Sequence, residues 1–165
     1  PDVKVYEPGE NYYYDKSLRR RLMRDSYINH ILKLETKLGL EGNIVRLGRL
    51  TPNQMVEYMS KCNVFVMPSV IENHSSTLIE AMMVGAPCVT SYVGGISEYL
   101  RDGENGFFYN SSEPEMLASR VIELFGDIDK CIAISTEARK NTIEARCVAL
   151  DLTRDFETIY SNIAK

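Results

Sequence analysis

Two glutamates, Glu72 and Glu80, flank a short run of hydroxyl-bearing residues, Ser75-Ser76-Thr77. If a helix begins near Ser75 or Ser76, its first backbone N–H groups and the positive end of its dipole form a site for phosphate oxygens. The carboxylates on either side can accept hydrogen bonds from vicinal hydroxyls. A ligand with hydroxyls at both ends and phosphate between them, such as a nucleotide sugar, has this layout. From the spacing alone, a second reading fits equally well: Glu80 is a solvated helix residue, and the serines only cap the helix.

The elements around these residues alternate between strand and helix. A continuous apolar run, 64–67, ends at Pro68 and predicts a strand buried on both faces of a parallel sheet. A helix over 78–84 follows, and Gly85 ends it. Hydrophobic patterns and turn residues predict further strands at 3–6, 43–47 and 87–90, and helices at 16–39 and 51–61, the second opened by Thr51 and Pro52.

This alternation predicts a Rossmann-like α/β fold, an open and mostly parallel sheet with flanking helices and right-handed crossovers. After it, helices at 113–125, 130–146 and 149–163 predict a helical C-terminal tail without clear strands. Ligands of such sheets bind outside the carboxyl ends of the strands. We therefore expect the site in the loops that follow Leu47, Met67 and Ser91.

Composition and charge narrow the classes of partner. A formal net charge of −4 and a pI near 5.3 argue against nucleic-acid binding. No apolar run is long enough to cross a bilayer. A basic cluster near the N-terminus fits a solvated helix face better than a contact with an anionic membrane, because no clear apolar insertion face adjoins it: Lys16, Arg19, Arg20, Arg21 and Arg24.

The four cysteines lack the spacing of a zinc site or a redox pair: Cys62, Cys88, Cys131 and Cys147. They are expected to be reduced thiols that pack as small hydrophobic side chains. Together with the lack of an N-terminal signal pattern, this favours a cytoplasmic location.

The two glutamates belong to a longer pattern, whose members in chain order are Pro68-Ser69, Glu72, Glu80-Ala81-Met82, Gly85, Pro87, Gly94-Gly95 and Glu98. This pattern resembles the C-terminal domain of the retaining glycosyltransferases of the GT-B fold, the group called glycosyl transferases group 1. Segments 39–48 and 102–107 are similar to other parts of that family. The resemblance therefore covers about residues 38–109, in order and at family-like spacing.

The resemblance implies a role for each residue of the site. Glu80 would hydrogen-bond the ribose of the nucleotide. Glu72, as the catalytic residue, would lie near the transferred sugar and support charge that develops at the reacting carbon. The other donor-binding residues would hold the sugar and diphosphate, flank the base, or form a loop that approaches closely: His74, Ser75, Ser76 and Thr77; Arg49 and Leu50; Gly94 and Gly95.

Three qualifications accompany these roles. His74 is expected to contact the donor and not to act as a general base. From the sequence alone, an ordinary turn fits Gly94-Gly95 as well as a close approach does. No cofactor or metal ion is expected, since the nucleotide-diphosphate sugar is itself the donor substrate and the key loops show no metal-binding aspartate motif.

The sequence differs from the family in having no Lys or Arg between Cys62 and Leu100. A leaving diphosphate develops negative charge, and a helix N-terminus supplies only about half an elementary charge. The resemblance implies that an upstream strand–helix unit supplies the cations and that an N-terminal domain presents a saccharide or lipid-linked acceptor. We therefore expect residues 1–165 to be a partial nucleotide-sugar-binding domain of a retaining hexosyltransferase, which alone binds the donor without transferring it.

By analogy with the family, the intact enzyme is expected to act in cell-surface polysaccharide synthesis, in the cytoplasm or at the inner face of the membrane, with peripheral membrane contact left open. Two alternatives remain at this stage. One is a non-catalytic nucleotide-binding α/β module. The other is a nucleotide-sugar epimerase of the GT-B type, which would need further acid–base residues and for which His74 is the only obvious candidate.

Overall fold

The computed structural model describes residues 5–7 and 27–163, and the side chains of 29–145. The chain divides into two compact units, Pro1–Met55 and Val56–Lys165, and each is described by itself. The basic cluster expected at 16–24 lies outside the described residues. None of the helices in the described part is long and apolar enough to span a membrane.

The first unit contains a parallel pair of strands and one helix. Strand β1 (Val5–Glu7) pairs with β2 (Ile44–Arg46), with Val5 opposite Ile44. Helix α2 (Tyr27–Leu38) lies between them in the chain and corresponds to the second part of the helix expected at 16–39. The buried carboxylate of Glu35 on α2 accepts a hydrogen bond from Arg46 Nη2 at 2.5 Å, which ties the helix to the end of β2.

Helix α3 (Pro52–Lys61) begins where the sequence predicts. Gln54 N donates to Thr51 Oγ1 at 3.4 Å, and Thr51 N donates back to Gln54 Oε1 at 2.9 Å. This reciprocal pair satisfies two backbone donors at the helix start, and Pro52 occupies the first helical position, where a missing N–H costs nothing.

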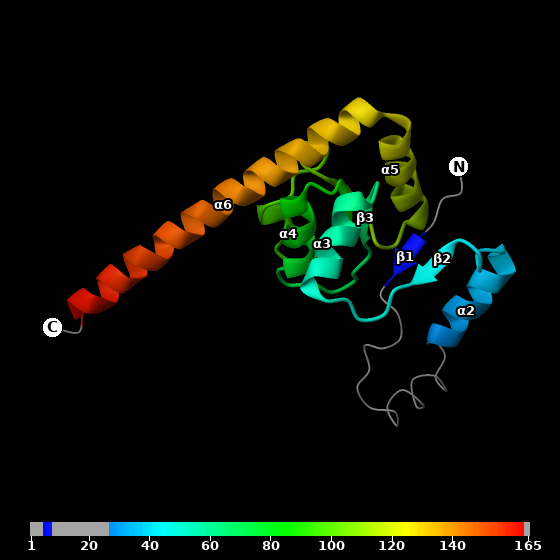
Figure 1. The fold of residues 1–165 in the computed structure, drawn as a ribbon, viewed down its shortest axis with the longest axis horizontal. Helices are drawn as coiled ribbons and strands as arrows, with labels where there is room; N and C mark the ends of the chain where they lie inside the picture. Colours follow the sequence, from blue (N-terminus) through cyan, green and yellow to red (C-terminus); the bar gives the residue numbers. More distant parts are fainter. Residues whose placement is uncertain (1–4, 8–26, 164–165) are drawn as a thin grey trace, which may run out of the picture. The chain divides into compact units, whose positions relative to one another are not determined.

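The second unit, coloured from blue-green to red in Figure 1, is built on a three-stranded parallel sheet. Its strands are β3 (Phe65–Met67), β4 (Cys88–Ser91) and β5 (Phe107–Tyr109), in that order, with Phe65 opposite Cys88 and Val89 opposite Phe107. The connecting elements are α4 (Ser76–Val84) and the short 3-10 helix η2 (Ile96–Glu98); α5 (Pro114–Gly126) and α6 (Ile128–Ile163) follow. The fold class is therefore confirmed as an α/β fold with an open parallel sheet, flanking helices and a helical C-terminal part.

One hydrophobic cluster of the second unit lies between the sheet and the last two helices. Its buried members come from β4, β5, α5 and α6: Val89, Phe107, Tyr109, Leu124 and Ile134. Helix α6 also packs against α4, where Arg139 Nη1 donates to the carbonyl of Met83 at 3.0 Å. Gly85 ends α4 with a φ of +83°, the left-handed cap that the sequence predicts.

Three details differ from the sequence expectation. Strand β5 was not predicted, because three residues directly after Gly106 give too short an apolar run to separate from a turn. The tail contains one continuous helix over 128–163 in place of two, which is consistent with the lack of Gly or Pro between Arg146 and Ala149. In β3, only Met67 is fully buried, while Phe65 and Val66 are half-buried.

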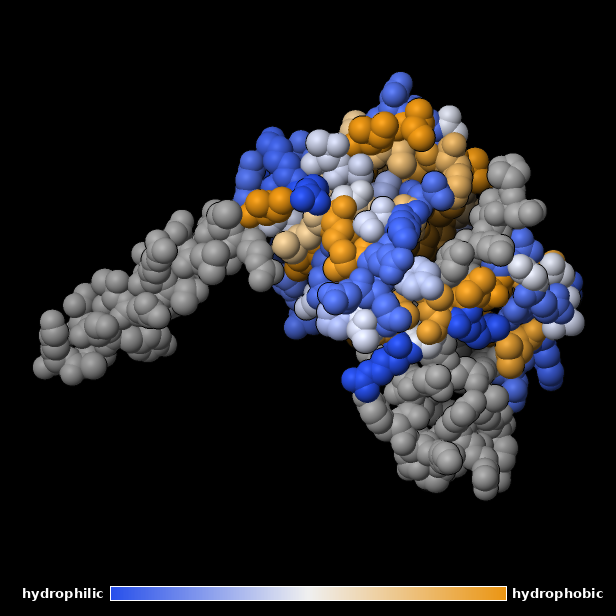
Figure 2. Space-filling model, viewed as in Figure 1, coloured by the Kyte–Doolittle hydropathy of each residue, from blue (hydrophilic) through white to orange (hydrophobic). Residues whose placement is uncertain are grey.

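A group of apolar side chains is exposed where α5 meets α6 (Figure 2). Its members are Ile122, Phe125, Ile128 and Ile132, between 53% and 73% exposed.

Candidate functional site

The loops after β3 and β4 are joined at the carboxyl edge of the sheet. Thr90 Oγ1 donates to the carbonyl of Met67 at 3.3 Å, and Ser91 Oγ donates to the carbonyl of Ser69. Further along, the N–H of Gly95 donates to the carbonyl of Asn73 at 2.9 Å. The segment with Glu72 and the segment with the two glycines therefore form one surface, as expected for a ligand site at the ends of parallel strands.

Gly94 lies at the closest approach of these two loops. Its φ is +57°, and a Cβ added to it would lie 2.1 Å from the carbonyl oxygen of Glu72 and 2.8 Å from that of Asn73. No side chain fits in that space, so of the two readings left open by the sequence the structure shows the close approach, with a positive φ at Gly94. Gly95 has a φ of −86°, and a Cβ there would lie 3.4 Å from the Asn73 carbonyl oxygen.

Helix α4 begins at the hydroxyl run, two residues before the start predicted at Leu78, so the condition for a phosphate site at this run is met. Ser75 is the N-cap: its Oγ accepts a hydrogen bond from Leu78 N at 3.3 Å and donates to Met67 Sδ at 3.0 Å. The first helical backbone bond runs from Ile79 N to Ser75 O. Helix geometry therefore leaves the N–H groups of Ser76 and Thr77 without an intrahelical acceptor, at the positive end of the dipole.

The hydroxyl side chains divide into one that is buried and two that are exposed. Ser75 is buried at 5% exposure, and its hydroxyl is used by the cap, so it can offer a ligand only its backbone. Ser76 and Thr77 are exposed. Glu80, also exposed, lies four and three residues further along α4, so the three side chains share one face of the helix.

Glu72 and His74 lie in the loop just before this helix start. Glu72 is half-buried and His74 is exposed. The imidazole of His74 stacks on the ring of Tyr99, with centroids 5.1 Å apart and planes tilted by 30°. The structure therefore brings together Glu72 and His74 with the start of α4 and the Gly94-Gly95 loop.

The expected base-flanking residues belong to the other unit. Arg49, which is exposed, and Leu50, which is half-buried, follow β2 in the first unit. Their role next to the nucleotide stays a prediction.

Two features of the site were missed in the sequence. Tyr99 directly follows Glu98, the last residue of the motif and of the short helix η2. In the sequence, only this position next to the motif could have indicated a role for Tyr99. Its hydroxyl oxygen is buried and makes no hydrogen bond of ordinary geometry among the described residues. Burial raises the pKa of Tyr99, while the nearby backbone N–H of Ser75 lowers it and the charge of Glu72 raises it. The phenol is therefore neutral at physiological pH.

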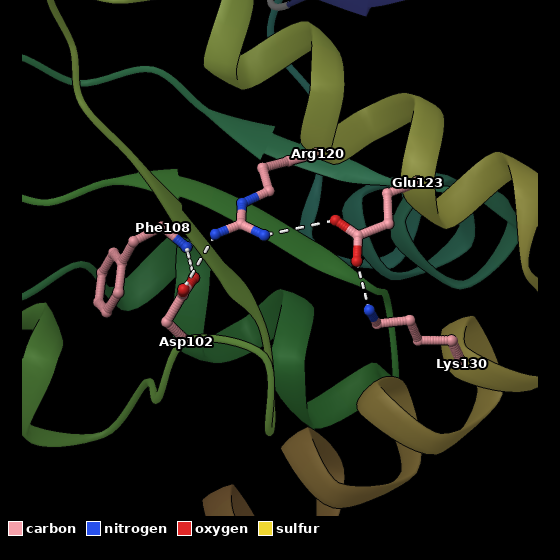
Figure 3. Close-up of polar contacts among 5 residues, drawn as sticks. All are labelled: Asp102, Phe108, Arg120, Glu123 and Lys130. Atoms are coloured by element: carbon pink, nitrogen blue, oxygen red, sulfur yellow. Dashed lines mark hydrogen bonds and ion pairs between the residues drawn. The ribbon is translucent and has the colours of Figure 1, made fainter.

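The second feature is a set of ion pairs that fixes the turn at 102–106 (Figure 3). Asp102 Oδ1 accepts from the N–H of Phe108 at 2.7 Å, and its Oδ2 accepts from Arg120 Nη2 at 3.0 Å. Glu123 accepts from Arg120 Nη1 at 3.3 Å and from Lys130, and these two cations hold the pKa of Glu123 below its usual value, Lys130 making the larger contribution. The Arg120 guanidinium also lies 4.6 Å from the centre of the Phe107 ring. The network joins the turn after η2 to α5 and α6.

Among the described residues of both units, no group of three or more His, Cys, Asp or Glu side chains is placed to hold a metal ion. Cys62, Cys88 and Cys131 are free thiols, and burial raises the pKa of each. They are therefore poor nucleophiles at neutral pH.

The fold and the site together define half of a GT-B glycosyltransferase, matching the C-terminal portion of such enzymes. The chain belongs to the family glycosyl transferases group 1, which it matches over residues 27–141.

Individual relatives are distant. The N-acetyl-alpha-D-glucosaminyl L-malate synthase of Bacillus anthracis is 26% identical over 135 residues, which are 82% of this chain and 35% of that protein. Among solved structures, Anabaena Alr3699/HepE in complex with UDP is 25% identical, with a TM-score of 0.79 over 98% of this chain and 42% of that one. Its complex with UDP and glucose aligns at 26% identity, with a TM-score of 0.74 over 82% of this chain and 36% of that one. The chain thus spans less than half of each of these proteins.

Proposed function

We propose that this chain is the donor-binding part of a retaining glycosyltransferase and that it binds a nucleotide-diphosphate sugar at the start of α4. The observation that carries the proposal is the arrangement of that helix start. It presents the N–H groups of Ser76 and Thr77, it has Glu80 on the same helical face, and it is joined through Glu72 and Asn73 to the Gly94-Gly95 loop. Polar groups for both ends of such a ligand and for its phosphates are therefore close together.

Each part of the donor has a partner in this arrangement. The diphosphate accepts hydrogen bonds from the N–H groups at the start of α4, Ser76 and Thr77, where the helix dipole also favours negative charge. Glu80 accepts from the ribose hydroxyls. Glu72 and His74 contact the transferred sugar, Ser75 contributes its backbone, and the Gly94-Gly95 loop approaches the ligand through its own backbone. For Arg49 and Leu50, which belong to the first unit, the role next to the base is proposed from the family resemblance alone.

Catalysis would come chiefly from positioning and electrostatics. Glu72, half-buried beside the helix start, would support positive charge at the reacting carbon as the bond to the diphosphate breaks. The opposite charge on the leaving diphosphate has no cationic side chain to meet it between Cys62 and Leu100. We therefore expect this chain to bind the donor but not to transfer the sugar, a saccharide or lipid-linked acceptor being bound by a further domain.

The relatives suggest the first ligand to test. Because Anabaena Alr3699/HepE was solved with UDP, and with UDP and glucose, UDP and UDP-glucose are the first probes. Hexosyl transfer in cell-surface polysaccharide synthesis, on the cytoplasmic side of the membrane, is the setting that we propose for the intact enzyme.

Calorimetric titration of this chain with nucleoside diphosphates and their sugars tests the proposal. Glu80→Ala should weaken binding by at least about tenfold, because a charged acceptor of two ribose hydroxyls is lost. Glu144→Ala is the matched control: Glu144 is likewise an exposed helix glutamate, but it lies on α6. Equal affinities of the two variants would overturn the ribose role of Glu80, and a lack of binding by the unchanged chain at millimolar concentration would contradict the proposed function.

A further inference from the structure

The segment 72–75 is held in place by a second segment, 94–99, through three contacts. The backbone of Gly94 packs against the carbonyl of Glu72, and the N–H of Gly95 donates to Asn73. The third contact is between side chains: the ring of Tyr99 stacks on that of His74 at 5.1 Å. The first two contacts fix only the backbone of the segment, so the orientation of the exposed His74 ring depends on the third.

Tyr99 is itself firmly anchored. Its backbone N–H donates to the carbonyl of Ile96 at 3.2 Å, and Ile96 is fully buried. Its carbonyl accepts from Asn105 Nδ2 at 3.0 Å, and Asn105 is buried at 1% exposure with its Oδ1 bound to Arg101 N at 2.7 Å. The backbone of Tyr99 is therefore fixed by buried partners, and the His74 imidazole packs against the ring of this residue.

The hydroxyl of Tyr99 lies among groups of the site. Its oxygen is buried and has no hydrogen-bond partner of ordinary geometry among the described residues, and the Ser75 backbone N–H and the Glu72 charge both influence its pKa. A leucine or valine at this position would fill the space but could not present a flat face to the imidazole.

We propose that Tyr99 is a positioning residue of the donor site, whose ring holds the His74 imidazole in the orientation that contacts the bound donor. This inference rests on the proposed function. An exposed histidine samples several rotamers in solution, and a ligand that selects one of them must offset the lost entropy. A stacked ring removes that cost before the donor arrives, so Tyr99 raises affinity without touching the donor.

A double-mutant cycle tests this on the full chain, with UDP-glucose as the ligand in calorimetry. The variants are Tyr99→Phe, Tyr99→Leu, His74→Gln, and Tyr99→Leu combined with His74→Gln. Loss of one aromatic pair should weaken binding by about fivefold in Tyr99→Leu, whereas Tyr99→Phe keeps the ring and should bind within about twofold of the unchanged chain. In the His74→Gln background, Tyr99→Leu should have no further effect, because the residue through which it acts is gone.

Two further measurements separate positioning from a general loss of structure. Thermal unfolding is recorded for every variant, and Tyr99→Met is included as a second non-aromatic replacement in case the leucine variant does not fold. Nuclear magnetic resonance follows the ring protons of His74, one of only two histidines in the chain. Their upfield ring-current shift should be present in the unchanged chain and in Tyr99→Phe, and should be lost in Tyr99→Leu and Tyr99→Met.

The outcomes distinguish this inference from the proposed function. If the unchanged chain binds UDP-glucose and the folded Tyr99→Leu or Tyr99→Met variant binds equally well, the positioning role is wrong and the donor site stands. Additive losses in the double variant also overturn the positioning role, since they show an effect that does not pass through His74. If the unchanged chain binds no nucleotide sugar, the proposed function fails and this inference fails with it.

Discussion

At the scale of single residues, Gly94 constrains the site most tightly. Its positive φ and the 2.1 Å that would separate an added Cβ from the Glu72 carbonyl oxygen leave no space for any other amino acid. The carbonyl that would be displaced belongs to the residue proposed to face the transferred sugar. Stability and ligand binding are therefore linked at this position.

Gly94→Ala is expected to lower the free energy of unfolding by about 1–3 kcal/mol, because it adds a steric clash to a left-handed backbone conformation. It should also reduce nucleotide affinity by moving Glu72. Chemical denaturation and calorimetry measure the two effects. Gly126→Ala is the control, since an added Cβ there meets nothing within 4 Å, and it should leave both quantities nearly unchanged.

A Gly94→Ala variant as stable as the unchanged chain would show that the two loops are not held as close as the structure indicates.

At the scale of elements, the start of α4 has two separate functions in one short run of hydroxyl residues. Ser75 caps the helix from inside, and the exposed Ser76 and Thr77 leave their N–H groups to a ligand. Removing the cap should therefore affect folding more than binding.

Ser75→Ala is expected to lower the free energy of unfolding by about 1 kcal/mol, the usual cost of losing an N-cap. The measurement is urea denaturation, with Ser119→Ala on the exposed face of α5 as the control that should change stability little. A stability equal to that of the control would mean that the Leu78 N–H finds another acceptor and that the Ser75 hydroxyl is free for the ligand.

The elements also show how far sequence reasoning extends. The glycine end of α4 and the capped start of α3 were predictable, because caps and glycines follow local backbone rules. The exact start of α4 was not, and the sequence fitted an ordinary turn at Gly94-Gly95 as well as the close approach. Strand β5 and the stacking of Tyr99 were not, because both depend on contacts made by residues distant in the sequence. Glu72 and Glu80 were proposed from their spacing together with the family pattern, but only the structure shows that Ser75, between them, is turned inward.

At the scale of the whole molecule, ion pairs join elements of the second unit, in addition to its apolar core. Glu123 on α5 receives hydrogen bonds from Lys130 on α6 and from Arg120, which also pairs with Asp102 of the turn after η2. These pairs hold the folded-state pKa of Glu123 below its ordinary value of 4.5.

The free energy of unfolding should therefore fall on acidification. A carboxylate whose pKa is depressed on folding stabilises the protein above its unfolded-state pKa, and the stabilisation is lost as the pH falls through the folded-state value. Glu123→Gln should reduce the part of the pH dependence below about pH 4.5, measured by denaturation at a series of pH values. Because Glu123 is partly exposed, the effect should be modest and should shrink with added salt. Identical pH profiles for Glu123→Gln and the unchanged chain would contradict the role given to the network.

The central claim is that a nucleotide-diphosphate sugar binds at the start of α4. The most direct measurement is a nuclear magnetic resonance titration of the backbone amides with UDP-glucose. The claim predicts the largest shifts at Ser76, Thr77 and the Gly94-Gly95 loop, with the Ser76 and Thr77 amides moving downfield as they donate to phosphate. Saturable shifts confined to other parts of the chain, with these amides unmoved, would contradict it.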